Sequence, residues 1–377
     1  MVARPSGTDH RVIHPGVSCR FRGQEMSACR VEPDAGLTRV PRRAMMVTKQ
    51  GNATMDAQAT ERSGLALPVV DISGLASDAP LVRAQVGRAI RAACLDKGFM
   101  YVVGHGIDAG LRARVLMQAA SFFTRPEAQK MAVSMAKSPC NRGYEPIRGQ
   151  TLEAGAPPDL KESFYSGEDL PLDDPRVRAG KFNHGPNQWP EGMPEFRATM
   201  EAYFDAMQEL SARLMRGLAL SLDLPEDHFD GFCRQPMSNL RLIHYPPQPA
   251  TPLPGEKGCG AHCDWGALTL LMQDEAGGLQ VHDEAAGWVD APPLADSYVV
   301  NLGDMIARWT NDRYRSTLHR VVNVSGRERY SVPFFFSGNP DEPVVCLPGC
   351  ALPGEAPRYP PTTVEGHLRE MYARTYA

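Results

Sequence analysis

Two histidines and one aspartate have the types and spacing needed to hold a metal ion. His262 and Asp264 are two positions apart in the segment Ala-His-Cys-Asp-Trp, which we expect at the head of a strand. Side chains two apart on a strand point to the same face, so this pair would project together and Cys263 would turn away. His319 lies 57 residues after His262 on another predicted strand. Two imidazoles and one carboxylate leave coordination positions open, as in non-haem Fe(II) oxygenases.

The same three ligands are also compatible with other kinds of metal site. A zinc hydrolase could use three such ligands, and a non-catalytic barrel could hold a structural metal ion. A closed structural site normally fills four positions, and the sequence offers no evident fourth ligand. His244 is expected to pack beside Tyr245, and we interpret Cys259 and Cys263 as free thiols.

A second pair of residues has the chemistry to bind a carboxylate. Arg329 and Ser331 lie two apart on a predicted strand, at the start of the apolar run 332–336. The guanidinium is a planar fork of donors that matches a carboxylate, and the serine adds a hydroxyl donor. A dicarboxylic cosubstrate needs such an anchor at its far end, so we favour this interpretation over a surface charge.

The elements that would position these residues are short strands accompanied by helices. Apolar periodicity predicts helices and turn signals separate the strands, whereas 137–192 shows little periodicity and reads as a long loop region. The many short strands after residue 238 favour a mainly β fold with flanking helices around a jelly-roll, or double-stranded β-helix, core. The helices are expected at 80–97, 109–123, 126–135, 196–218 and 363–376, and the strands at 67–72, 99–103, 239–245, 261–272, 279–282, 297–302, 318–324 and 329–336.

The first 64 residues differ from the rest of the chain. They lack apolar periodicity, which predicts a disordered extension or a start codon assigned too early. Their acidic residues argue against a transit peptide. The expected parts are the extension 1–64, a mixed N-terminal region 65–235, an oxygenase core 236–345 and a tail with a helix 346–377.

Composition sets the broad class of the protein. The 377 residues are 42% hydrophobic and 22% charged, which is globular composition. The net charge of −4 gives no basic field for nucleic acid, and no run approaches the 18 apolar residues of a membrane span. Nine cysteines without a repeated CxxC indicate reduced thiols. We therefore expect a cytoplasmic monomer whose partners are small molecules.

Five segments together resemble a known family. Over residues 67–377 the chain resembles the isopenicillin N synthase-like branch of the 2-oxoglutarate and Fe(II)-dependent dioxygenases. The segments are ACLDKGFMYVVGHGI (93–107), DLKESFYSG (159–167), HCDWGALTLLMQDEAGGLQV (262–281), VVNLGDMIARWTNDRYRSTLHRVV (299–322) and RYSVPFFF (329–336).

The resemblance implies the cofactors and the residues that hold them. Fe(II), 2-oxoglutarate and O2 would together oxidise a small organic substrate by hydroxylation, desaturation or cyclisation, with release of succinate and CO2. No catalytic residue is implied beyond the iron ligands. The usual Asn two positions before Tyr245 is Ile243 here, which puts its cosubstrate contact in doubt. By family pattern the iron ligands are His262, Asp264 and His319, and the C5 carboxylate of 2-oxoglutarate is held by Arg329, Ser331 and Tyr245.

The primary substrate is less well defined by the sequence. Some members of the branch use no 2-oxoglutarate, and there the Arg-x-Ser pair binds a substrate carboxylate. The segment HGPNQWP (184–190) is similar to one in bacterial ethylene-forming enzymes, so an ethylene- and succinate-forming enzyme is another alternative. The candidate substrate contacts are Arg148, Glu162, Phe164, Trp265, Phe334 and Phe336.

Overall fold

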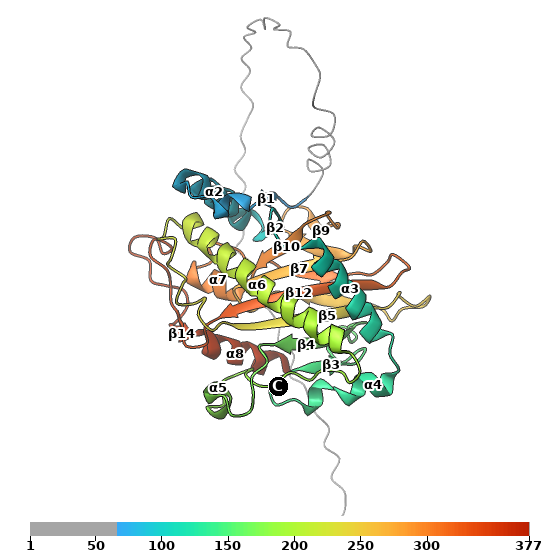
Figure 1. Cartoon of the computed structure of the whole chain (residues 1–377). Coiled ribbons are helices and arrows are strands. Elements are labelled where there is room, and N and C mark those ends of the chain that lie inside the picture. The colour runs from blue at the N-terminus through green and yellow to red at the C-terminus, as the bar shows by residue number, and fades with distance from the viewer. Residues whose placement is uncertain (1–65, 377) are drawn as a thin grey trace, which may run out of the picture. The chain divides into compact units, whose positions relative to one another are not determined.

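Two β-sheets form the centre of the chain in the computed structural model, which describes residues 66–376. The larger sheet has eight strands in the order β1 (Val69–Asp71), β2 (Phe99–Val103), β10 (Tyr298–Leu302), β7 (Leu268–Gln273), β12 (Arg329–Gly338), β5 (Met237–Tyr245), β4 (Glu162–Gly167) and β3 (Gly143–Glu145). The smaller sheet has the order β6 (Cys259–His262), β11 (His319–Val321), β8 (Leu279–Asp283) and β9 (Gly287–Asp290). The strands of the larger sheet run across the molecule in Figure 1.

Helices cover the outer face of the larger sheet. The long helix α6 (Pro194–Ser221) lies across β12 and β7, next to α3 (Ala109–Phe123) and α2 (Pro80–Asp96) (Figure 1). Its apolar stripe faces the sheet as the helical period requires. The ring centroids of Phe204 and Phe334 lie 5.3 Å apart. This helix layer and the two sheets confirm a mainly β fold with flanking helices.

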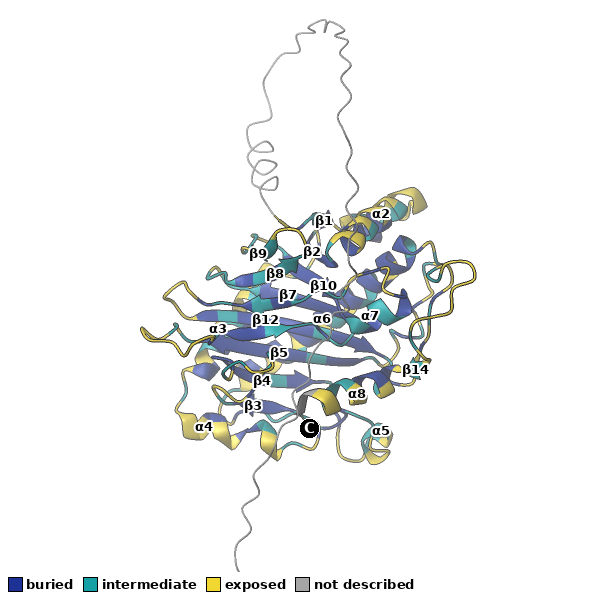
Figure 2. Cartoon of the chain, turned by 180° about the vertical axis from the view of Figure 1, so that it is seen from behind, coloured by how far each residue is buried: buried dark blue, intermediate teal, exposed yellow. Residues whose placement is uncertain are grey.

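A second buried cluster lies between the two sheets. It takes Tyr101, Ile243 and Tyr245 from the larger sheet and Val281 and Val321 from the smaller one. The central strands are therefore buried on both faces, as the dark ribbons of β7, β12 and β5 show in Figure 2. Side chains alternate along each strand, so one set packs against the helices and the other points between the sheets.

Two predicted segments differ in the structure. The strand expected at 261–272 is two strands, β6 and β7, which belong to different sheets. The chain turns between them at Gly266, where a Cβ would come within 2.8 Å of the Ser337 Oγ. The loop region expected at 137–192 contains β3 and β4, which extend the larger sheet beyond β5. These two strands are short, and their polar residues are buried, so they show no alternation of apolar and polar residues in the sequence.

Several smaller elements complete the described chain. Helix α7 (Asp304–Trp309) and strand β9 were not predicted. The C-terminal helix α8 (Val364–Tyr376) confirms the expected one. The remaining elements are η1 (Ser73–Ala76), α4 (Glu127–Ala132), η2 (Met135–Lys137), α5 (Pro175–Arg178), β13 (Pro343–Val344) and β14 (Thr362–Thr363).

Strands of the N-terminal region and of the expected core share one sheet. β1 to β4 precede the boundary predicted at residue 235, and the described residues 66–376 cluster as a single unit. The extension predicted at 1–64 lies outside the described residues. Among residues 66–376 no helix is both long and apolar enough to cross a membrane.

Candidate active site

Two paired strands bring the two candidate histidine ligands together. His262 ends β6 and His319 begins β11, and the antiparallel register places them directly opposite each other. Their ring centroids are 4.3 Å apart. The Nε2 atoms of His262 and His319 lie 3.7 and 3.8 Å from Oδ1 of Asp264. One ligand atom from each of the three residues lies within 4.8 Å of the other two.

Backbone carbonyl groups orient both imidazole rings. His262 Nδ1 donates to the Gly260 carbonyl at 2.9 Å, and His319 Nδ1 donates to the Thr317 carbonyl at 3.1 Å. Each Nε2 therefore keeps its lone pair and points toward Asp264. Burial lowers the pKa of His262 and lowers that of His319 to about 4. Both rings are thus neutral near pH 7, which is the form that binds a metal ion.

Asp264 lies beyond the end of β6, so strand alternation does not position it. Its Oδ2 accepts a hydrogen bond from Asn301 Nδ2 on β10 at 2.8 Å, and its carbonyl accepts one from the Asp304 amide at 2.8 Å. Burial raises the pKa of Asp264, but the positive charge that the two imidazoles gain at acidic pH and the hydrogen bond from Asn301 outweigh this effect and hold the pKa below its usual value. An ionised carboxylate beside two neutral imidazoles fits a divalent cation.

Arg329 carries a buried charge without a counter-ion. The residue is fully buried, and no carboxylate of residues 66–376 lies within ion-pair distance of it. Nε donates to the Gly277 carbonyl at 2.6 Å and Nη1 to Ser331 Oγ at 3.1 Å. The guanidinium carbon lies 4.7 Å from the ring centroid of Tyr245. Because a buried unpaired charge is costly, this arrangement calls for an anionic ligand.

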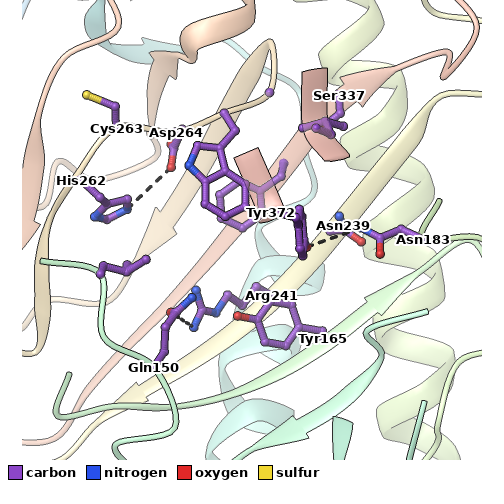
Figure 3. Close-up of a pocket in the computed structure, with 15 residues that line it drawn as sticks. Gln150, Tyr165, Asn183, Asn239, Arg241, His262, Cys263, Asp264, Ser337 and Tyr372 are labelled. Atoms are coloured by element: carbon purple, nitrogen blue, oxygen red, sulfur yellow. Dashed lines mark hydrogen bonds and ion pairs between the residues drawn. The ribbon is translucent and has the colours of Figure 1, made fainter. Parts of the chain in front are cut away.

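A pocket opens beside the candidate metal group, formed by His262, Asp264 and His319. It encloses about 700 Å³ together with its mouth. Figure 3 shows His262 and Asp264 on one side of it and amide and phenol groups on the other. Besides His262, Asp264 and Trp265 the lining includes Gln150, Leu152, Tyr165, Asn183, Asn239, Arg241, Cys263, Phe335, Ser337, Leu368 and Tyr372.

Of the six candidate substrate contacts, the structure brings Trp265 alone to this pocket. Arg148 is not among the lining residues, and its Nη2 pairs with Glu256 at 2.7 Å. Glu162 is buried elsewhere, where its carboxylate accepts hydrogen bonds from Lys130 and Tyr144, each at 2.6 Å.

Three aromatic candidates lie on the opposite faces of their strands. Phe164 packs against Phe122 in the helix-side cluster, with ring centroids 5.0 Å apart. Phe334 and Phe336 face the same side of the sheet and belong to the same cluster. Their strand neighbours point the other way, so Tyr165 and Phe335 line the pocket in place of Phe164 and Phe334.

The same alternation identifies pocket residues that the sequence analysis missed. On β5 the interior side chains are odd-numbered, and Asn239 and Arg241 precede Ile243 and Tyr245 in that set. Counting back from Tyr245 in steps of two would have identified Arg241 and Asn239, because residues two apart on a strand share a face. Counting forward from Arg329 does the same on β12. On β12 the set continues from Ser331 to the lining residues Phe335 and Ser337.

His244 and the two cysteines near the metal group have other partners. His244 Nδ1 lies 2.7 Å from Glu162 Oε1, and its ring stacks on Tyr330 at 4.9 Å. Cys259 Sγ lies 3.5 Å from the Lys161 ammonium. Cys263 points away from His262, as expected (Figure 3).

Comparisons with known proteins agree with this geometry. Residues 67–192 match a family model described as the N-terminal region of non-haem dioxygenases in morphine synthesis. Residues 236–338 match the 2OG-Fe(II) oxygenase superfamily. The chain therefore belongs to the 2-oxoglutarate and Fe(II)-dependent oxygenases, in the isopenicillin N synthase-like branch.

Among the relatives, the chain is 45% identical to the 2-oxoglutarate-Fe(II) type oxidoreductase hxnY of Emericella nidulans, covering 82% of this chain and 90% of that one. It is 42% identical to the 2-oxoglutarate-dependent dioxygenase citB of Monascus ruber, covering 84% and 97%. The solved structure of a full-length Neurospora crassa protein in complex with alpha-KG and thymine superposes with a TM-score of 0.73 at 31% identity, covering 83% and 98%.

These matches confirm the predicted double-stranded β-helix core and the enzyme class. The protein is a dioxygenase that uses Fe(II), 2-oxoglutarate and O2 to oxidise a small organic substrate.

Proposed function

We propose that His262, Asp264 and His319 hold the Fe(II). We further propose that Arg329, Ser331 and Tyr245 hold the distal carboxylate of 2-oxoglutarate. The bound iron supplies oxidation of the substrate by O2, coupled to conversion of 2-oxoglutarate to succinate and CO2. The protein orients the reactants and excludes water, while the metal carries the redox chemistry.

The single observation that carries this proposal is the buried, uncompensated charge of Arg329. In a family whose cosubstrate is a dicarboxylate, a guanidinium with a hydroxyl beside it is a suitable anchor. A charge-assisted hydrogen bond contributes about 1.5–3 kcal/mol, so two such bonds change affinity by about two orders of magnitude or more. Ile243 pairs with Ser331 across the strands, so the Asn contact of other members is replaced by an apolar side chain.

Other residues of this chain shape the entrance of the substrate pocket. His367 on α8 donates from Nε2 to the Trp265 carbonyl at 2.9 Å. The ring of Tyr372 packs edge-on against Trp265, with centroids 5.1 Å apart. This helix therefore covers one side of the pocket and limits the access of water to the reacting atoms.

Release of labelled CO2 from C1-labelled 2-oxoglutarate tests this function. The wild-type protein with Fe(II) should release CO2 in step with succinate, and Asp264→Ala should release at least about 1000-fold less, because a ligand of the metal is lost. Cys346→Ala is the control and should retain activity, since Cys346 does not line the pocket and its Sγ lies beside the Leu347 carbonyl. CO2 release from Asp264→Ala at the wild-type rate would overturn the assignment.

A fragmentation of 2-oxoglutarate to ethylene has weaker support. The segment that suggested it, 184–190, does not line the pocket. Asn187 instead hydrogen-bonds the backbone of Gly167 through both side-chain atoms, and Trp189 Nε1 donates to Asp169. Headspace gas chromatography of the same reaction decides this alternative, and we expect no ethylene above background.

We also propose that the enzyme acts as a monomer in the cytoplasm. The seven cysteines among residues 66–376 form no disulfide with one another, as a reducing compartment allows. Light scattering coupled to gel filtration measures the oligomeric state, and a mass near 41.3 kDa is expected.

A further inference from the structure

Arg142 determines which end of the Asn239 amide faces the substrate pocket. Asn239 lies on the interior face of β5 and lines the pocket. Its Oδ1 accepts a hydrogen bond from Nη1 of Arg142, whose Nη2 donates to the Asn183 carbonyl at 2.8 Å. A guanidinium only donates hydrogen bonds, so the amide oxygen must face Arg142 and the Nδ2 group must face away from it. Within residues 66–376 no acceptor binds this Nδ2.

A second unpaired donor lies on the neighbouring strand. Ser337 is 5% exposed, lies on the interior face of β12 and lines the same pocket. Its Oγ has no hydrogen-bond partner in the described part of the chain. The absence of a side chain at Gly266 leaves this hydroxyl open, since a Cβ there would approach the Oγ to 2.8 Å. Buried polar groups are normally hydrogen-bonded, so both donors are suited to a ligand acceptor.

The lining offers little net charge to a substrate. Apart from His262 and Asp264 of the metal group, Arg241 is the charged residue among the described lining residues. Its Nη2 lies 3.0 Å from Glu145 Oε2 and 3.1 Å from Gln150 Oε1. Glu145 therefore compensates this guanidinium, in contrast to Arg329. An ionised substrate group would gain less here than at the 2-oxoglutarate anchor.

Aromatic side chains form the remaining walls of the pocket. Trp265 comes from the segment between β6 and β7, Phe335 from β12, and Tyr372 from α8. Such surfaces favour flat, conjugated ligands, because aromatic rings gain from offset stacking and edge contacts.

We propose that the primary substrate is an uncharged, planar ring carrying a carbonyl or hydroxyl oxygen. Its oxygen acceptors face Asn239 Nδ2 and Ser337 Oγ, and its ring packs against Trp265 and Phe335. The two donors are then specificity-determining residues. This inference rests on the proposed function, because the pocket is the substrate site only if His262, Asp264 and His319 bind the iron.

Binding of four matched rings tests the inference without turnover. The probes are 6-methylpyridin-2-one, 4-methylphenol, toluene and 4-methylbenzoate, titrated by calorimetry into the protein with Fe(II) and 2-oxoglutarate under nitrogen. We expect one or both neutral oxygenated rings to bind at least about tenfold more tightly than toluene and 4-methylbenzoate, as one good hydrogen bond provides.

Two variants and one control assign the effect to the donors. Ser337→Ala removes the hydroxyl, and Asn239→Asp keeps the acceptor for Arg142 while replacing the donor by an acceptor. Each should weaken binding of the neutral oxygenated rings by about tenfold or more and leave toluene unchanged. Ser238→Ala is the control, since Ser238 lies next to Asn239 but donates to Gln208 on the helix side. It should change binding by less than about twofold.

Three results would overturn the inference. They are tightest binding of 4-methylbenzoate, unchanged affinities in both variants, and no binding of any of the four rings. CO2 release from 2-oxoglutarate, measured in parallel, separates this failure from failure of the proposed function. If the protein turns over 2-oxoglutarate but ring binding does not depend on Asn239 and Ser337, the proposed substrate class alone is rejected. If the protein shows no turnover of 2-oxoglutarate at all, the proposed function is rejected.

Discussion

Individual charged residues in this enzyme are buried in two different ways. Glu162 is neutralised by its neighbours, through Lys130, Tyr144 and His244. Arg329 is bound by a carbonyl, a hydroxyl and an amide oxygen, none of which carries a charge. A charge of the first kind stabilises the fold, and a charge of the second kind is suited to binding an anion.

Arg329→Gln should separate ligand binding from stability. The KM for 2-oxoglutarate should rise by about 100-fold with a smaller change in kcat, because two charge-assisted bonds are lost. The ligand-free variant should be at least as stable as the wild type in thermal unfolding, since a buried unpaired charge is removed. Arg327→Gln is the control, because Arg327 is exposed two positions earlier. A large loss of stability with unchanged KM would contradict the assignment.

Glu162→Gln should change how stability depends on pH. Burial raises the pKa of Glu162, but hydrogen bonds from His244, Lys130 and Tyr144 outweigh it and hold the pKa below the usual 4.5. The depressed pKa contributes stability that is present above pH 4.5 and is lost as pH falls through the folded-state pKa. Urea unfolding should therefore show a large difference between the two proteins at pH 7 that shrinks below pH 4.5. A difference independent of pH would contradict this origin.

At the scale of elements, β6 is an edge strand whose outer backbone groups are bound by carboxylates. Asp159 Oδ1 accepts from the Gly260 amide at 2.8 Å, and Glu153 Oε2 accepts from the Ala261 amide at 3.0 Å. The same loop supplies Gln150 and Leu152 to the pocket. The strand that carries His262 is thus held by the loop that lines the pocket.

Asp159→Ala should destabilise the protein by about 3–5 kcal/mol, because it leaves the buried Lys161 ammonium without its partner. Adding Lys161→Met should recover much of that loss, since no buried charge remains. Glu153→Ala is the comparison and should cost about 1 kcal/mol, because its ion pair with Lys257 is partly exposed. Urea unfolding measures all three. Equal losses for Asp159→Ala and the double variant would show that the ion pair is not the cause.

At the scale of the whole molecule, the pocket depends on segments far apart in sequence. The amide of Asn183 lies 3.4 Å from the Tyr372 hydroxyl, and Trp265 packs against the same tyrosine. The C-terminal helix therefore completes a pocket whose proposed metal ligands lie between residues 262 and 319.

Tyr372→Ala should open the pocket without affecting the cosubstrate anchor. The KM for the primary substrate should rise by about tenfold, and more 2-oxoglutarate should be consumed per product formed, as water enters. The KM for 2-oxoglutarate should change by less than about twofold. Arg374→Ala, on an exposed position of the same helix, should leave all three values unchanged. Product and succinate measured together check the coupling, and an unchanged ratio in Tyr372→Ala would argue against a covering role.

Much of the fold and the metal group could be predicted from sequence because the signals are local. The apolar stripe of α6 repeats with the helical period over 28 residues. His262 and Asp264 are two positions apart, and so are Arg329 and Ser331. Charged and metal-ligating side chains next to apolar strands are expected to be buried, and buried groups of these types usually bind a metal ion or a charged partner. The chemistry of the enzyme is therefore encoded in short segments.

Only the tertiary structure decided which face of each strand packs against the helices, which face points between the sheets, and which distant segments are in contact. Alternation groups Phe334 with Phe336 and Phe335 with Ser337, but it does not say which group faces the helices. Only the packing of α6 on β12 makes that choice. The break of 261–272 into strands of two sheets and the meeting of α8 with Trp265 depend likewise on contacts between distant residues. Such contacts leave no periodic trace in the sequence, because the free energy that stabilises them comes from burial in the assembled fold.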